Sequence, residues 1–280
     1  MSSRSNHLIG APRDAIDASL TPQEAVFDFN VVSNFSRDYL ATYYLQPPTN
    51  DEQVVLSFLA RHYPKITSQP CAIEIGCGPT VHHVLPLAPF VSEIHMADYL
   101  LDNLEQVRRW RDGMPDAHRW NHYTAFTLAL EGQGIANADI ARREADTRRK
   151  ITSLLHCDLK RDQPLQTEQQ YPVVTSFYCA ENIGITYDEW FKVLRRLANL
   201  TASGGYLFLS ALRETRFYVI ESADGRRQRL PSAYLTEQHF RDVLPELGFD
   251  IRETVLESTS LEGQEEAGVK GVILVAALKA

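Results

Sequence analysis

The stretch AIEIGCGPT, residues 72–80, is the sequence feature that most constrains the fold. It reads as a buried strand that ends in a glycine-rich turn, and residues 92–98 read as a second strand that ends in Asp98. A glycine turn after one strand, with an acid about 20 residues later, is typical of an α/β nucleotide site. Gly76 and Gly78 let the backbone approach a ligand where a Cβ atom would block it. The acid can accept hydrogen bonds from both hydroxyls of a ribose.

The residue that follows this turn narrows the choice of cofactor. A dinucleotide turn carries a third glycine three residues after the second, and that position is Val81 here. The pattern therefore favours S-adenosylmethionine (SAM), which has a ribose but no pyrophosphate, over a nicotinamide cofactor. This stretch alone leaves an ordinary strand–turn–helix corner as the other interpretation.

Length and charge exclude some classes of protein. The 280 residues suit one large domain or one domain with a cap, and the net charge of −8 argues against a nucleic-acid partner. No apolar run is long enough to span a membrane, and the N-terminus lacks the apolar core of a signal peptide. The four cysteines form no CxxC pair, which fits a reducing compartment. We therefore expect a cytoplasmic protein without a membrane partner.

The remaining pattern alternates strands with helices, which predicts a mainly parallel sheet covered on both faces. A short linker, residues 260–268, joins the last two strands, which we expect to pair as an antiparallel hairpin. The fold class is thus α/β: a Rossmann-like sheet of seven strands, mainly parallel with the last strand antiparallel, and an N-terminal helical lid. The predicted strands are 71–75, 93–97, 152–157, 172–178, 205–212, 249–258 and 269–278, and the predicted helices are 21–44, 51–63, 80–88, 100–112, 138–150, 186–200 and 236–247.

The alternation also predicts how the chain divides. Residues 1–64 form a helical lid or cap, and residues 65–280 form the main domain. A segment at 113–150 interrupts the alternation as a helical insert. Its charged second half is interpreted as a solvated helix.

Several motifs in order resemble the family of nicotinamide, phenylethanolamine and indolethylamine N-methyltransferases, which are SAM-dependent enzymes. The resemblance runs from about Phe35 to Leu278. The segments that carry it are NFSRDYLATYY at 34–44, IGCGPT at 75–80, ADY at 97–99 with Asn103, CDL at 157–159, SFYCAE at 176–181 and VKGV at 269–272.

The resemblance implies a role for each matching cofactor residue. Tyr39 and Tyr44 would close over the methionine end of SAM, and Thr80 would offer a hydroxyl and a helix N-terminus to its carboxylate. Asp98 would accept from the ribose hydroxyls. The full set of implied cofactor residues is Tyr39, Tyr44, Gly76, Cys77, Gly78, Thr80, Asp98, Tyr99, Asn103, Asp158 and Leu159, where Cys77 replaces the family's usual serine.

The resemblance also implies an acceptor site. Glu181 follows a predicted strand at the edge where open α/β sheets bind ligands, and it could hold a cationic amine or accept its proton. Glu214 is the second candidate acid, although Arg213 or Arg216 could neutralise it. The other implied substrate contacts are Phe35, Tyr178 and Tyr218.

The leading hypothesis is SAM-dependent methyl transfer to the nitrogen of a small amine or N-heteroaromatic metabolite, by a monomer or weak dimer. Methyl transfer to oxygen or sulfur, and a non-catalytic SAM-binding protein, are the alternatives. The tyrosine usual in the family shortly after Thr80 is His82 here, a departure on the substrate side. No histidine spacing indicates a metal site, so we expect none.

Overall fold

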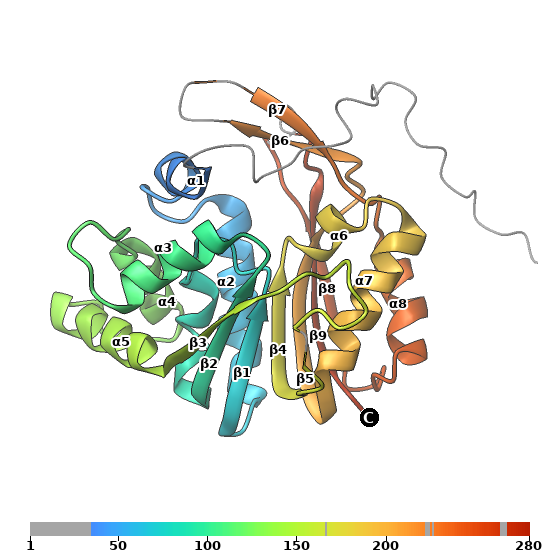
Figure 1. Ribbon diagram of the computed structural model, residues 1–280, viewed down its shortest axis with the longest axis horizontal. Coiled ribbons are helices and arrows are strands. Elements are labelled where there is room, and N and C mark those ends of the chain that lie inside the picture. The colour runs from blue at the N-terminus through green and yellow to red at the C-terminus, as the bar shows by residue number, and fades with distance from the viewer. Residues whose placement is uncertain (1–34, 166, 222–224, 226, 264–267) are drawn as a thin grey trace, which may run out of the picture.

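A seven-stranded sheet forms the centre of the molecule, which is described here as a computed structural model of residues 35–165, 167–221, 225, 227–263 and 268–280 (Figure 1). The neighbouring pairs from β3 to β5 are parallel, and β9 is antiparallel to both β5 and β8, which confirms the predicted fold class. In spatial order the strands are β3 (Ile151–His156), β2 (Val91–Asp98), β1 (Gln69–Ile75), β4 (Tyr171–Phe177), β5 (Thr201–Leu212), β9 (Gly271–Leu278) and β8 (Val255–Ser260).

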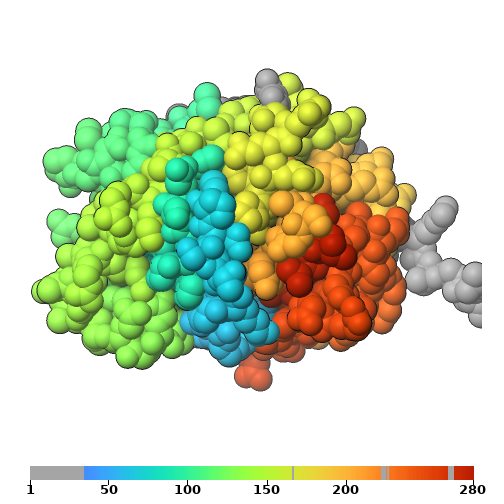
Figure 2. All heavy atoms as spheres, turned by 90° about the horizontal axis from the view of Figure 1, so that it is seen from below, coloured from blue at the N-terminus to red at the C-terminus, as the bar shows by residue number. Residues whose placement is uncertain are grey.

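Helices cover both faces of this sheet because its strands are apolar on both sides. In β1, Ala72 packs into the core that contains α2, α3 and α4, whereas Ile73 packs into the core of α7 and α8. Figure 2, seen from below, shows 121–150 in green and the C-terminal region in orange to red on opposite sides of the blue and teal segments. The helices are α1 (Phe35–Tyr43), α2 (Asn50–His62), α3 (Leu101–Arg111), α4 (Asn121–Leu130), α5 (Asn137–Lys150), α6 (Ala180–Ile183), α7 (Tyr187–Leu200) and α8 (Glu237–Glu246).

Local sequence explains where α7 begins. Thr186 starts α7 with a capping box, in which its side chain accepts from the Glu189 N–H and the Glu189 side chain accepts from the Thr186 N–H. The predicted helix at 21–44 is described only from Phe35, because its first part lies outside the described residues. For the same reason the lid domain predicted at 1–64 is described only from that residue.

The predicted helix at 80–88 is wrong. The chain forms two short 3₁₀ turns there, His82–Val84 and Ala88–Phe90. Pro86 and Pro89 remove backbone donors and clash with a preceding turn, so an α-helix cannot extend through this segment. The chain after the glycine turn is consequently a compact loop that packs its histidines inward.

Two other elements differ from the prediction. The strand predicted at 249–258 begins only at Val255. A two-stranded antiparallel ribbon of β6 (Phe217–Glu221) and β7 (Arg227–Pro231) was not predicted at all. Figure 1 shows this ribbon and α1 beyond the end of the sheet from which α6 emerges, so they stand over the carboxyl ends of the parallel strands.

Candidate active site

The glycine turn after β1 is tightly packed against the end of β4. Gly76 and Gly78 have φ angles of +68° and +60°, a conformation that other residues rarely adopt. A Cβ atom on Gly76 would lie 2.2 Å from the Sγ atom of Cys179, so no larger residue fits without movement. For a Cβ atom on Gly78, the nearest heavy atom among the described residues is the Cγ2 atom of Thr80, at 4.0 Å. The backbone at Gly78 is therefore open to a ligand.

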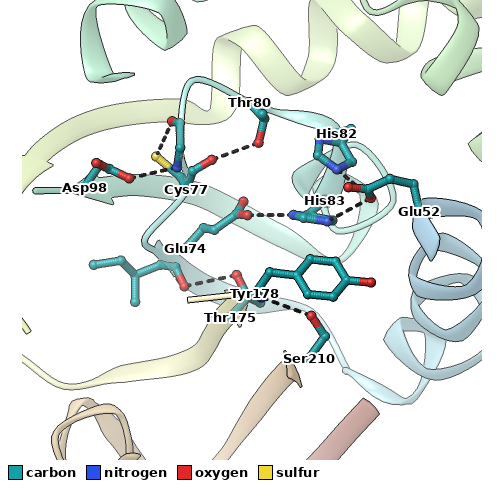
Figure 3. Close-up of polar contacts among 12 residues, drawn as sticks. Glu52, Glu74, Cys77, Thr80, His82, His83, Asp98, Thr175, Tyr178 and Ser210 are labelled. Atoms are coloured by element: carbon teal, nitrogen blue, oxygen red, sulfur yellow. Dashed lines mark hydrogen bonds and ion pairs between the residues drawn. The ribbon is translucent and has the colours of Figure 1, made fainter. Parts of the chain in front are cut away.

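Asp98, at the end of β2, fixes this turn. Its Oδ2 atom accepts the Gly78 N–H at 2.8 Å, and its Oδ1 atom accepts from the Leu100 N–H at 2.8 Å and the Asn103 Nδ2 at 3.0 Å (Figure 3). Burial raises the pKa of Asp98, and these hydrogen bonds oppose the rise. The predicted ribose acid and the predicted cofactor turn are thus brought together.

The lid helix α1 lies against the same region. The Ser36 hydroxyl donates to Asn103 Oδ1 at 2.6 Å, and the Tyr43 hydroxyl accepts the Glu221 N–H from β6 at 2.7 Å. The Tyr39 ring stacks on Phe35 at 5.7 Å and lies 5.6 Å from the Tyr44 ring. The predicted lid aromatics are therefore grouped between α3 and the ribbon.

The segment after β3 joins the end of β2. The Cys157 N–H donates to the Asp98 carbonyl at 2.9 Å, which places Asp158 and Leu159 at the next strand end. The Asp158 carboxylate accepts from the Lys160 N–H at 2.9 Å and from Arg161 Nε at 3.1 Å. Tyr99 is 50% exposed, so its ring is available at the surface. The cofactor roles of these residues stay predictions.

Tyr178, at the end of β4, has a strained backbone. Its φ of 49° is unusual for a residue with a side chain, and its N–H donates to the Ser210 hydroxyl of β5 at 3.1 Å (Figure 3). Its own hydroxyl is buried without a hydrogen-bond partner among the described residues. Strained residues and unpaired buried polar atoms of this kind gather at functional sites.

Glu181 is fully buried on α6. Its Oε1 atom accepts the Leu212 N–H at 3.1 Å, whereas its Oε2 atom has no partner within the described part of the chain. Burial raises the pKa of Glu181 to about 7, against the hydrogen bonds that its carboxylate accepts. This carboxyl group can therefore exchange a proton near neutral pH.

Glu214 and Tyr218 lie in the chain that follows β5. Glu214 is half-buried and has a φ of 50°, and its N–H donates to the Leu235 carbonyl at 2.7 Å. Burial is the main cause that raises the pKa of Tyr218. Arg213 pairs with Glu237 at 3.7 Å. In the described residues no hydrogen bond or ion pair joins Glu214 to Glu181.

Thr80 does not begin an α-helix, and the predicted contact of a helix N-terminus with a carboxylate is wrong in that respect. Its hydroxyl donates to the Cys77 carbonyl at 2.8 Å, which closes the turn. The residues after it belong to a buried polar network that sequence reasoning missed, formed by Tyr44, Glu52, Glu74, His82 and His83. Its one visible signal is that Glu52 lies three and four positions before Val55 and Leu56, on the buried face of α2.

The described cysteines are all free thiols. Within the described residues, none of the helices has the length and apolar character needed to cross a bilayer.

Comparison with known proteins gives a family match. The model of the NNMT/PNMT/TEMT family matches residues 24–280. Phenylethanolamine N-methyltransferase of Macaca mulatta is 27% identical over 185 residues, 65% of this chain, and the match spans only 63% of that relative. Nicotinamide N-methyltransferase of Homo sapiens is 26% identical over 229 residues, 79% of this chain and 84% of that protein.

A solved structure shares the fold. The magnesium protoporphyrin IX methyltransferase of Synechocystis PCC 6803, determined with bound SAM, superposes with a TM-score of 0.51 at 13% sequence identity. The superposition covers 88% of this chain and 92% of that one. At this identity the likeness bears on the fold alone.

Proposed function

Because this chain belongs to the NNMT/PNMT/TEMT family, we propose that it transfers a methyl group from SAM to the nitrogen of a small amine or N-heteroaromatic compound held near Glu181. The observation that carries the proposal is the Glu181 carboxyl group, which is fully buried at the strand ends and whose Oε2 atom finds no partner among the described residues. A buried carboxylate without a partner costs free energy, and a cationic acceptor would supply the missing partner.

The residues at the strand ends fit SAM. The Gly78 backbone leaves no Cβ atom on the open side of the turn, and Asp98 lies beside it at the end of β2. Gly76, Cys77 and Gly78 would hold the middle of the cofactor, Asp98 with Asn103 its ribose, Tyr99, Asp158 and Leu159 its adenine, and Tyr39, Tyr44 and Thr80 its methionine end.

When bound, SAM supplies a methyl group that its positive sulfur has already activated. In the transfer a nitrogen–carbon bond forms, the carbon–sulfur bond breaks, and the sulfur leaves as a neutral thioether. The protein needs no nucleophile of its own, because aligning the nitrogen with the methyl group and excluding water supply most of the catalysis. Phe35, Tyr178 and Tyr218 provide apolar walls for that purpose.

The protein must also remove a proton from an amine acceptor. An aliphatic amine is protonated at neutral pH and must lose its proton to become a nucleophile. Glu181, with its pKa raised to about 7, is suited to hold the ammonium ion and to accept that proton. Glu214, with its half-buried side chain and strained backbone, is the second acid assigned to the acceptor.

The two relatives named above differ in what their acceptors require. A ring nitrogen such as that of nicotinamide carries a free electron pair and needs no base, whereas the amine of a phenylethanolamine does. The buried, proton-exchanging Glu181 favours the aliphatic amine as the acceptor class. We also place the reaction in the cytoplasm, supported by the free thiols, and assign it to a monomer or weak dimer.

Mass spectrometry with methyl-labelled SAM tests the proposal. The purified protein is incubated with arylethylamines, pyridines, catechols and thiols, next to the E181Q variant and the control D188N, which changes an exposed acid at the start of α7. Label on an amine nitrogen with wild type and D188N, and much less with E181Q, is expected. Label only on oxygen or sulfur, or on no acceptor while SAM still binds, would contradict the proposal.

A further inference from the structure

Glu52 connects the lid to the loop that follows the glycine turn. This α2 residue is only 5% exposed. Its Oε1 atom accepts from the Tyr44 hydroxyl at 3.2 Å, and its Oε2 atom lies 2.9 Å from His82 Nε2 and 3.4 Å from His83 Nε2. Figure 3 shows the Glu52 carboxylate facing both imidazole rings. One carboxylate thus contacts the end of the lid and two neighbouring residues of the loop.

The network continues from His83 into the sheet. His83 Nδ1 lies 3.1 Å from an oxygen of Glu74 on β1, the strand that leads into the glycine turn. Both acids and both histidines are buried, and the His83 ring lies 4.2 Å from the Phe177 ring. Buried charges of this kind persist only when they are paired.

Rings and polar groups from other elements enclose the histidines. His82 stacks on Trp120 at 5.3 Å with an interplanar angle of 13°, and lies 5.2 Å from the Tyr44 ring and 5.0 Å from the Tyr123 ring. The acids that act on these histidines are Glu52, Glu74 and, for His82, also Asp51. Exchange with water is therefore limited, and the network must balance its charge internally.

The charges of the network are set by its pairing. Burial lowers the pKa of His82, which leaves it neutral despite Glu52. Burial acts in the same direction on His83, but hydrogen bonds to Glu52 and Glu74 outweigh it and raise the pKa of His83 above its usual range. Burial raises the pKa of Glu52, but the two histidines more than offset it and keep that carboxylate ionised. His83 is thus a buried cation between two acids.

We propose that Glu52 is a positioning residue that couples the end of the lid helix α1 to the loop that follows the glycine turn, by holding Tyr44 on one carboxylate oxygen and His82 and His83 on the other. The inference rests on the proposed function, because it concerns the segments assigned there to the methionine end of SAM. Tyr44 and Thr80 belong to that assignment, and His82 is two residues beyond Thr80. A change at Glu52 would loosen both segments together.

The same atoms admit a different occupant. The ligating atoms of Glu52, His82 and His83 all lie within 4.8 Å of one another, which a divalent metal could use. A proton on His83 already accounts for its contacts with Glu52 and Glu74, so these contacts need no metal. A metal found at this site would contradict the proposal.

A double-mutant cycle tests the coupling. SAM affinity is measured by calorimetry at pH 7 for wild type, E52Q, Y44F and E52Q/Y44F. E257Q is the matched control. Glu257 of β8 also contacts a histidine of α2, His62, at 3.1 Å, but at the opposite end of that helix from Glu52. We expect E52Q to weaken SAM binding about tenfold to a hundredfold, the range for losing hydrogen bonds to a charged group. Once Glu52 is changed, Y44F should have little further effect.

Two further readouts separate positioning from general destabilisation. In steady-state kinetics E52Q should raise the KM for SAM more than it lowers kcat. SAM affinity should fall at alkaline pH, where His83 loses its proton. In E52Q this fall should occur at lower pH, because His83 has lost one of the two acids that raise its pKa. If E52Q does not fold, a cycle of Y44F with His82→Gln reports on the same carboxylate.

The outcomes are distinct. Additive effects of E52Q and Y44F, or an E52Q affinity equal to that of E257Q, would overturn the inference while leaving the proposed function intact. A stoichiometric metal in purified wild type that is missing from E52Q would also overturn it, in favour of a metal site. Failure of wild type to bind SAM would overturn the proposed function, and the inference with it.

Discussion

The carboxylate of Asp98 accepts the backbone N–H of Gly78 at 2.8 Å, across two strand ends and 20 residues of sequence. The two features that first indicated a nucleotide site are therefore in direct contact. The bond fixes the glycine turn after β1 against the end of β2, which preorganises the proposed cofactor surface. Such preorganisation reduces the cost of binding.

Replacing Asp98 should weaken SAM binding. D98A removes the acceptor of the Gly78, Leu100 and Asn103 donors, and it should weaken SAM binding by about 2 kcal/mol or more. D98N, which keeps the shape and one oxygen, should lose less. Calorimetric titration of both variants checks this, and an unchanged affinity of D98A would remove Asp98 from the cofactor site.

Gly76 should tolerate no side chain. Gly76 and Gly204 have similar φ angles of +68° and +72°, but a Cβ on Gly204 meets nothing within 4 Å, whereas on Gly76 it meets Cys179. G204A should therefore cost about 1 kcal/mol of unfolding free energy from backbone strain alone. G76A should cost clearly more, about 2–4 kcal/mol. Equal values in denaturant titrations would show that the contact with Cys179 is not a tight one.

Glu181→Gln should trade stability against turnover. Because burial raises the pKa of Glu181 from its usual 4.5 to about 7, its effect on stability is most favourable below pH 4.5 and is lost as the pH rises through 7. Glutamine cannot ionise, so at pH 8 E181Q should be more stable than wild type, by at most about 3 kcal/mol. Thermal unfolding at pH 5 and pH 8 measures this, and a gain that is the same at both pH values would contradict the account.

Alkaline pH should destabilise the fold through His83. Its pKa rises to about 9 in the folded chain, because the hydrogen bonds to Glu52 and Glu74 outweigh burial, which lowers it. The stabilisation is complete below the usual value of 6.5 and is lost as the pH rises through about 9. The melting temperature of wild type should fall over that interval more than that of His83→Gln. Parallel curves would mean that His83 is not the group responsible.

Glu214→Gln should act on the acceptor alone. Glu214 follows the end of β5, whereas the proposed cofactor residues lie on or after α1 and at the ends of β1, β2 and β3. We expect an increased KM for the amine, with SAM affinity as in wild type. Steady-state kinetics with varied amine decides, and an unchanged amine KM would leave Glu181 as the sole acidic contact.

The sheet could be predicted from the sequence because each strand has a local signal. The buried run at 72–75 and its glycines place β1, and Thr186 with Glu189 marks the start of α7. In the ribbon, β7 lacks such a signal because Arg227–Pro231 begins with three polar residues, although β6, Phe217–Glu221, is apolar up to its last residue. β7 pairs with β6, whose Glu221 N–H donates to the Tyr43 hydroxyl of α1.

The candidate site was predictable only in part, for a related reason. Asp98 and Glu181 end or follow strands, so topology brings them to one edge. Glu52 meets His82 across 30 residues and Tyr44 across 8, and nothing local identifies those partners. The helix predicted at 80–88 does not form because Pro86 and Pro89 interrupt it.

The most direct test of the central claim is the rate of labelled methyl transfer to an arylethylamine as a function of pH, for wild type and E181Q at saturating SAM. The account predicts N-methylated product, with wild-type activity rising through an apparent pKa near 7 and E181Q slow at every pH. Wild-type turnover in E181Q, with the same pH profile, would contradict it.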